Sequence, residues 1–123
     1  MALTTSTISE NLFPTVTEES DLDLTLQLIN DANTTLYAVE FTNPNTTGIY
    51  VRHIWVGSTS GLTTSTQYDM CYYIPASSSF SLYCGAGFAI EGGVIFWAST
   101  ETGTNSLNAP TSAVKVKVAY KDT

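Results

Sequence analysis

Few side chains in this sequence of 123 residues are suited to catalysis. His53 is the single histidine, and it lies at an alternating position in an apolar stretch typical of a β-strand. A catalytic Ser, Cys or Thr needs an adjacent base, and one isolated histidine does not supply a triad. We therefore interpret His53 as a structural or surface residue, predict no catalytic residue, and expect a protein that is not an enzyme.

Metal and phosphate sites are not indicated by the sequence either. Zinc and iron sites need three or four convergent ligands, and one histidine with the separated Cys71 and Cys84 falls short of that number. The glycine-rich segment 84–93 matches neither GxxxxGK[ST] nor a GxGxxG that opens a helix. We predict no metal and no cofactor, and we expect two free thiols that are mostly buried.

Two other kinds of site stay open as alternatives. A glycosidase needs only two carboxylates, so Glu40, Asp69 and Glu91 are candidates, although their sequence spacing does not show that they converge. A sugar-binding module would stack pyranose rings on exposed aromatic side chains. The candidates for that role are Tyr50, Trp55, Tyr72, Tyr73 and Trp97. Most of them lie in expected strands, where packing in a core or between subunits is the usual role.

Charge excludes further classes of partner. The formal net charge is −7 and the pI is near 4.2, whereas nucleic-acid binding relies on clustered lysines and arginines. No apolar run approaches the roughly 20 residues that a membrane-spanning helix needs. The sequence also begins without the basic and apolar regions of a secretory signal, so we expect synthesis in the cytoplasm, with neither nucleic acid nor membrane as a partner.

Residues 1–20 differ from the remainder and are predicted to form an N-terminal arm. They contain no Lys or Arg, and one apolar cluster, Leu12-Phe13-Pro14, stands among polar residues. Such a cluster cannot build a core alone, so we expect the arm to reach a neighbouring subunit or another partner, with folding back onto its own domain as the alternative. The predicted partner-binding residues are Leu12, Phe13, Pro14, Glu18, Glu19, Asp21 and Asp23.

Residues 21–123 are predicted to form one all-β domain. Leucines at alternate positions of segment 22–28 predict one strand, and segments 36–43 and 48–56 predict a β-hairpin. Segment 57–67 is expected to be a loop that projects from one end, and the glycine-rich segment 84–93 to bulge or to cross between sheets. Further strands are expected before residue 74 and at 79–83, 92–99 and 113–120. This pattern indicates an antiparallel β-sandwich or jelly roll of seven to eight strands.

Two blocks of the sequence resemble small virion proteins of tailed phages. In LYAVEFTNPNTTGIYVRHIWV (residues 36–56), an apolar strand ends in an Asn-centred turn and a Tyr-Val strand follows. Residues 73–120 have, in order, an Ile-Pro-Ala turn, a short strand, a glycine-rich segment, a central strand, a Gly-Thr-Asn loop and a closing Val-x-Val-x-Val strand. The two cysteines and the long arm depart from the looser pattern, so the location on a particle stays open.

The resemblance implies a capsid decoration or cement protein, a viral structural protein that binds the outer capsid lattice and stabilises it. The partners that it implies are the major capsid protein and neighbouring copies of the same chain, in a homotrimer on the exterior of the virion. A component of the neck, tail or fibre is the first alternative. A carbohydrate-binding module used for adsorption is the second.

Overall fold

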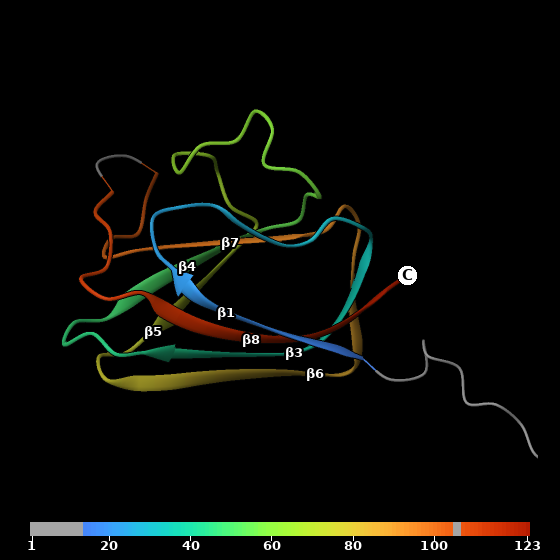
Figure 1. The fold of residues 1–123 in the computed structure, drawn as a ribbon, viewed down its shortest axis with the longest axis horizontal. Coiled ribbons are helices and arrows are strands. Elements are labelled where there is room, and N and C mark those ends of the chain that lie inside the picture. Colours follow the sequence, from blue (N-terminus) through green and yellow to red (C-terminus); the bar gives the residue numbers. More distant parts are fainter. Residues whose placement is uncertain (1–13, 105–106) are drawn as a thin grey trace, which may run out of the picture.

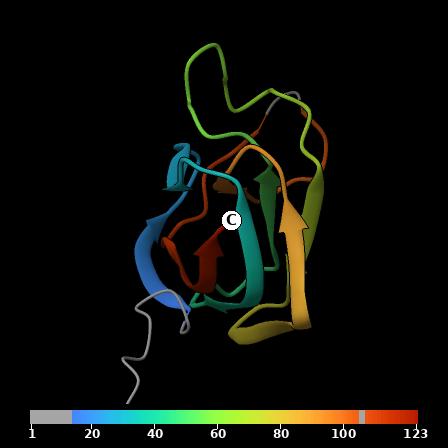
Figure 2. The same cartoon turned by 90° about the vertical axis from the view of Figure 1, so that its right-hand side faces the viewer.

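Two four-stranded antiparallel sheets face each other in the computed structural model, which describes residues 14–104 and 107–123 (Figures 1 and 2). Sheet A has the order β1-β8-β3-β6 and sheet B the order β2-β7-β4-β5. The strands are β1 (Thr15–Leu22), β2 (Gln27–Asn30), β3 (Thr34–Asn43), β4 (Ile49–Ile54), β5 (Met70–Ile74), β6 (Ser78–Ile90), β7 (Val94–Ser99) and β8 (Val114–Asp122). The prediction of an antiparallel β-sandwich is confirmed.

Alternation of side chains builds the main core between the sheets. On β8, Val114, Val116 and Val118 are fully buried while Lys115 and Lys117 are exposed, as the period of two predicts. On β7 all six residues are buried, because both faces of this strand are covered. One face meets sheet A, and the other lies beneath a loop.

That loop corrects one expectation about segment 57–67. In the structure this loop continues to residue 69 and, as the 57–69 loop, does not simply project from one end but lies over part of the outer face of sheet B (Figure 1). Leu62 and Tyr68 pack there against Ile95 and Trp97, and the Trp97 indole donates a hydrogen bond to the carbonyl of Thr64 at 3.2 Å. Burial of these apolar side chains in a second cluster holds the loop on the sheet.

The single strand expected over residues 22–28 is wrong. Leu22 ends β1 in sheet A and is fully buried, whereas Leu28 belongs to β2 in sheet B and is 45% exposed. Between them the Asp23 carboxylate accepts a hydrogen bond from the backbone amide of Thr25 at 2.8 Å. An aspartate that binds the backbone two residues later favours a turn, so the chain changes sheet here.

The expected hairpin of segments 36–43 and 48–56 is also wrong. β3 pairs with β8 and β6 in sheet A, while β4 pairs with β5 and β7 in sheet B. The buried side chain of Asn43 donates hydrogen bonds to the carbonyls of Thr47, Ile74 and Pro75 at 3.0 to 3.1 Å. These bonds anchor a turn that crosses between the sheets instead of closing a hairpin.

The boundary between arm and domain lies earlier than residue 21. β1 begins at Thr15, and residues 15–19 pair in register with β8, so residues 15–20 belong to the sandwich and not to the arm. β-Branched residues at 15–17 suit a strand, although this acidic segment has little apolar content to signal one. Leu12 and Phe13 lie outside the described residues.

The glycine-rich segment 84–93 both bulges and crosses between the sheets, so both expected outcomes are confirmed: residues 91–93 connect β6 in sheet A to β7 in sheet B. Four residues of β6, 84–87, lie opposite the single residue Tyr37 of β3, and β6 then continues to Ile90. At Gly87 φ is +114°, and a Cβ there would lie 2.4 Å from Cγ2 of Thr35. Glycine is therefore required at this point of the bulge.

Candidate interaction surface

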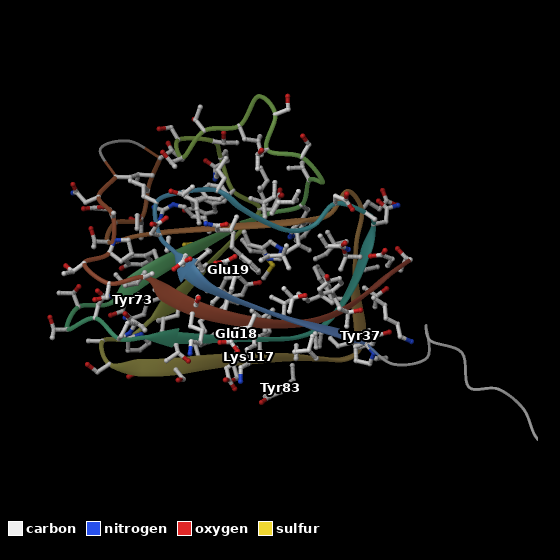
Figure 3. The ribbon with its side chains drawn as sticks, in the orientation of Figure 1. Glu18, Glu19, Tyr37, Tyr73, Tyr83 and Lys117 are labelled. Atoms are coloured by element: carbon white, nitrogen blue, oxygen red, sulfur yellow. The ribbon has the colours of Figure 1, made fainter. Side chains whose placement is uncertain are left out.

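The outer face of sheet A is open to solvent, whereas the centre of that of sheet B is covered by the loop between β4 and β5. Val16 on β1 is 66% exposed and Tyr83 on β6 is 75% exposed, at opposite edges of the sheet. A shallow groove of about 170 Å³ lies between them. The outward side chains along it are Val16, Ala38, Glu40, Tyr83, Lys117 and Ala119. A row of apolar side chains on this face is followed by a row that includes Lys117 and Glu40, and Figure 3 labels Lys117 and Tyr83 on the sheet.

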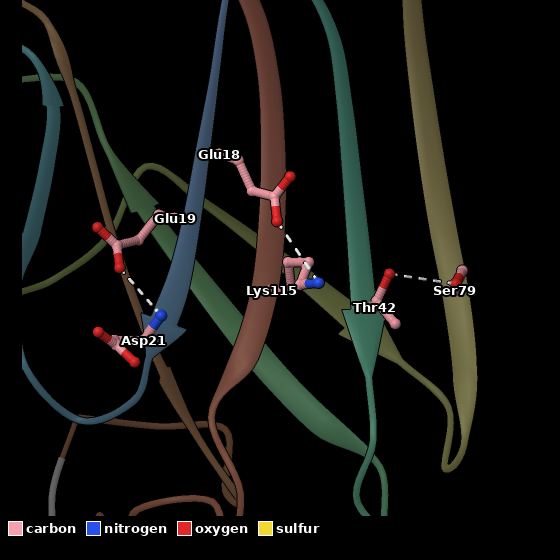
Figure 4. Close-up of polar contacts among 6 residues, drawn as sticks. All are labelled: Glu18, Glu19, Asp21, Thr42, Ser79 and Lys115. Carbon is pink, nitrogen blue, oxygen red and sulfur yellow. Dashed lines mark hydrogen bonds and ion pairs between the residues drawn. The ribbon is translucent and has the colours of Figure 1, made fainter.

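Opposite charges face one another across the same sheet. Lys117 lies opposite Glu18 on one side and opposite Glu40 on the other, and such cross-strand pairs are favourable. The Lys115 ammonium lies 3.4 Å from the carboxylate of Glu18, with both side chains about half exposed (Figure 4). In an acidic chain, the lysines of β8 give this face its cations.

The acidic residues predicted to bind a partner do not form one patch. Glu18 points to the outer face of sheet A, and its neighbour Glu19 accepts a hydrogen bond from the backbone amide of Asp21 at 2.9 Å (Figure 4). The Asp23 carboxylate accepts its hydrogen bond within the turn between β1 and β2. Pro14 is exposed just before β1. Among these residues Glu18 alone has a cationic neighbour in the described part of the chain.

A second surface lies on the side of the sandwich formed by the edge strands β5 and β6. A cavity of about 300 Å³ opens there between the sheets. Its lining consists of Leu36, Met70, Tyr72, Leu82, Cys84, Gly87 and Phe88. Neither edge strand contains a charged residue or a proline, the usual devices that keep an exposed edge from pairing with another chain. Sequence reasoning missed this surface, although the uncharged run 78–90 could have signalled it.

The single histidine is buried beside Tyr72, one of the residues that line this cavity. His53 is fully buried on β4, its Nδ1 lies 3.1 Å from the Tyr72 hydroxyl, and its ring centroid lies 4.5 Å from that of Phe96. Its Nε2 has no hydrogen-bond partner among the described residues. Burial lowers the pKa of His53 to about 3, so the imidazole is neutral near neutral pH.

Arg52 also proves to be structural, a role that sequence reasoning did not identify. Its fully buried guanidinium donates to the carbonyls of Thr102 and Gly103 at 3.0 and 2.9 Å, and also to the Glu101 carbonyl and the Ser99 hydroxyl. Desolvation lowers the pKa of Arg52. These hydrogen bonds hold the segment after β7 against sheet B. The buried guanidinium of Arg52 therefore does not offer an exposed anion-binding site.

The candidate carboxylates are not brought together. Glu40 lies on the outer face of sheet A and Glu91 in the turn between β6 and β7, while Asp69 accepts a hydrogen bond from the Trp55 backbone amide at 2.8 Å. No contact joins the three within residues 14–104, which contain them all. The same part of the chain, together with residues 107–123, holds no group of three or more potential metal ligands.

The candidate sugar-stacking aromatics are mostly buried or half-buried. Tyr72 and Trp97 belong to the two apolar clusters, and Trp55 packs against Phe88 with ring centroids 5.4 Å apart. Tyr73 is 51% exposed and lies against Tyr50, with ring centroids 5.1 Å apart. Of the five candidate aromatic side chains, all of which lie in the described residues, Tyr73 alone is exposed.

These features define an eight-stranded antiparallel β-sandwich with one open sheet face and one open, uncharged side. In the described ranges no helix is long and apolar enough to cross a membrane.

No family model and no curated protein matches this chain. A solved chain is similar to it over 98% of this chain and 100% of that chain, with 15% sequence identity and a TM-score of 0.39. That structure is described by the words "Bacillus endospore appendages form a novel family of disulfide-linked pili". At this identity and TM-score the similarity carries no statement about function, so function is argued from the surfaces above.

Proposed function

We propose that this chain is a non-enzymatic structural subunit that binds other protein subunits through the outer face of sheet A. The observation that carries the proposal is the asymmetry of the two sheets. The centre of the outer face of sheet B, at Ile95 and Trp97, is buried beneath the 57–69 loop, which leaves Leu28 and Tyr73 on the edge strands 45% and 51% exposed. The outer face of sheet A has no such cover among the described residues and exposes Val16 and Tyr83 to 66% and 75% on either side of a groove. An exposed tyrosine on a rigid sheet is a common energetic centre of protein interfaces.

Charge supports the same face. The chain has a net charge of −7, so two copies repel one another at most orientations. Lys115 and Lys117 are exposed on the outer face of sheet A, where they can meet an acidic surface of another subunit. Electrostatic complementarity of this kind orients an encounter and increases its rate.

The particular setting that we propose is a virus particle, as a capsid decoration or cement protein. The support is the resemblance of residues 36–56 and 73–120 to small virion proteins of tailed phages. A subunit that binds an assembled shell but not its dissociated parts stabilises the shell by linkage. The major capsid protein and two further copies in a trimer are the proposed partners. A neck, tail or fibre position is the rival within the same class.

The test compares two exposed tyrosines. Tyr83→Ser removes the ring at the groove, and Tyr73→Ser is the matched control on β5 in sheet B. We expect Tyr83→Ser to weaken binding to purified particles by at least about tenfold, or about 1.4 kcal/mol, and Tyr73→Ser to leave it near wild type. Equal binding by wild type and Tyr83→Ser would contradict this use of sheet A.

Quantitative gels of the particles then separate the rivals. Hundreds of copies per particle indicate decoration, whereas about a dozen or fewer indicate a neck or tail position. Hydrolysis of a glycan or peptide panel by the purified chain, lost in His53→Ala, would overturn the proposal that the chain is not an enzyme.

A further inference from the structure

The cavity between β5 and β6 arises from the bulge in β6. Residues 84–87 lie opposite one residue of β3, and Cys84 and Gly87 of this bulge contribute to the wall. Leu36 and Leu82 line it from sheet A, and the edge strand of sheet B completes it. The bulge therefore accompanies an opening between two sheets that are otherwise packed together.

The lining defines what the cavity can hold. Its seven residues include no charged side chain, and the polar atoms among them are a phenol, a thiol and a thioether. The rings of Phe88 and Trp55 make an edge-to-face contact beside it, with centroids 5.4 Å apart. A volume of about 300 Å³ with such walls suits apolar side chains, aromatic rings included.

We propose that this cavity binds the Leu12–Phe13 pair of a second copy of the chain. The proposal rests on the proposed function in requiring self-association, but it concerns a different surface from the outer face of sheet A. The chain contains 13 residues before Pro14, and Leu12-Phe13 is their adjacent pair of large apolar side chains directly before the sandwich. No charge on β5 or β6 opposes the approach of another acidic copy.

Within one subunit, the start of β1 and the cavity lie at opposite edges of sheet A. Thr15, Tyr120, Leu36 and Phe88 form one row across sheet A, so β8 and β3 separate the start of β1 from the cavity. Three strand spacings make roughly 14 Å, before any descent between the sheets. The two or three residues from Thr15 back to Phe13 and Leu12 span at most about 7–11 Å of backbone, so within one subunit their side chains would have to cover the rest of this distance. A neighbour's pair approaches the open side of the cavity without this constraint, so we assign the occupant to a neighbour, and a disulfide within one chain would contradict the assignment.

This contact joins two different surfaces, the segment before β1 on one copy and the β5–β6 side on the next. Such a heterologous contact closes into a ring if the rotation between copies permits and otherwise continues as an open chain. It is thus the type of contact that a trimer requires, whereas a contact between two identical patches would give a dimer.

Disulfide trapping tests the proposal on the full chain, because Cys84 lies in the cavity wall. Phe13→Cys is made in a Cys71→Ser background and oxidised at mildly alkaline pH, since burial raises the pKa of the Cys84 thiol. We expect a covalent dimer and higher multiples on a non-reducing gel, absent when Cys84→Ala is added. The matched control, Val16→Cys on the outer face of sheet A, should give no product that depends on Cys84.

Two results would overturn the inference. One is the absence of an intermolecular product that requires both Phe13→Cys and Cys84, and the other is a disulfide within one chain. A second measurement does not depend on thiol reactivity: Phe13→Ala should weaken self-association at least about tenfold by sedimentation. Unchanged association would also overturn it. These failures are distinguishable from a failure of the proposed function, which is read from Tyr83→Ser.

Discussion

Acid should destabilise this protein through His53 before it acts through the carboxylates. The imidazole is fully buried and neutral, and its pKa of about 3 in the folded chain compares with 6.5 for an unperturbed histidine. The unfolded chain therefore binds a proton at a higher pH than the folded chain does. The stability that follows from this difference is complete above about pH 6.5 and is lost as the pH falls toward about 3.

The size of the effect follows from linkage. At about pH 5 the unfolded histidine is protonated while the folded one is not, which costs about 2 kcal/mol relative to about pH 7. For a domain of this size the loss corresponds to a melting temperature lower by roughly 5–10 °C. The pKa of Glu101 is lowered, mainly by the hydrogen bond with the Asn108 side chain. Its contribution to stability is therefore lost only below the ordinary carboxyl pKa of 4.5, which lies outside this pH interval.

The assay is urea unfolding at about pH 7 and at about pH 5, followed by circular dichroism. His53→Phe removes the titrating group, so its free energy of unfolding should fall by about 2 kcal/mol less than that of wild type over this interval. Tyr72→Phe removes the hydroxyl but keeps the imidazole, and it should retain the wild-type pH dependence. Equal losses in wild type and His53→Phe would refute the reasoning, whatever the absolute stability of each variant.

Three further predictions concern packing, charge and thiols. Trp97→Ala removes a fully buried ring and should lower the free energy of unfolding by about 3–5 kcal/mol, measured by heat or urea. A loss below about 1 kcal/mol would show that the 57–69 loop is not packed as described. Lys115→Ala breaks the exposed pair with Glu18 and should change stability by less than about 1 kcal/mol; a larger loss, reduced by salt, would contradict this. The double variant Cys71→Ser, Cys84→Ala should remain a folded β protein and lose at most about 2 kcal/mol of stability. A thiol assay of the wild type in denaturant should detect two free thiols, and a missing thiol would indicate a disulfide.

Local alternation along the chain was sufficient for much of the fold. Val114, Val116 and Val118 alternate with lysines on β8, and the apolar run of β7 predicts a buried strand. Turn residues separate these segments at short intervals, so the all-β class and the sandwich were accessible without coordinates. The net charge of −7 likewise predicts from the sequence alone that nucleic acid is not a partner.

Tertiary structure alone decided which strands are neighbours and which faces remain open. A period of two predicts which side chains share a face, but not what covers that face. The leucines of residues 22–28 therefore predict one strand, whereas Leu22 and Leu28 belong to different sheets and Leu24 and Leu26 lie in the turn between them. The structural role of Arg52 is not visible in the sequence, because its partners are carbonyls some 50 residues away. The cavity depends on a bulge in β6 and on β5 across the sandwich. Such pairings are set by the summed burial of distant segments, which no local pattern encodes.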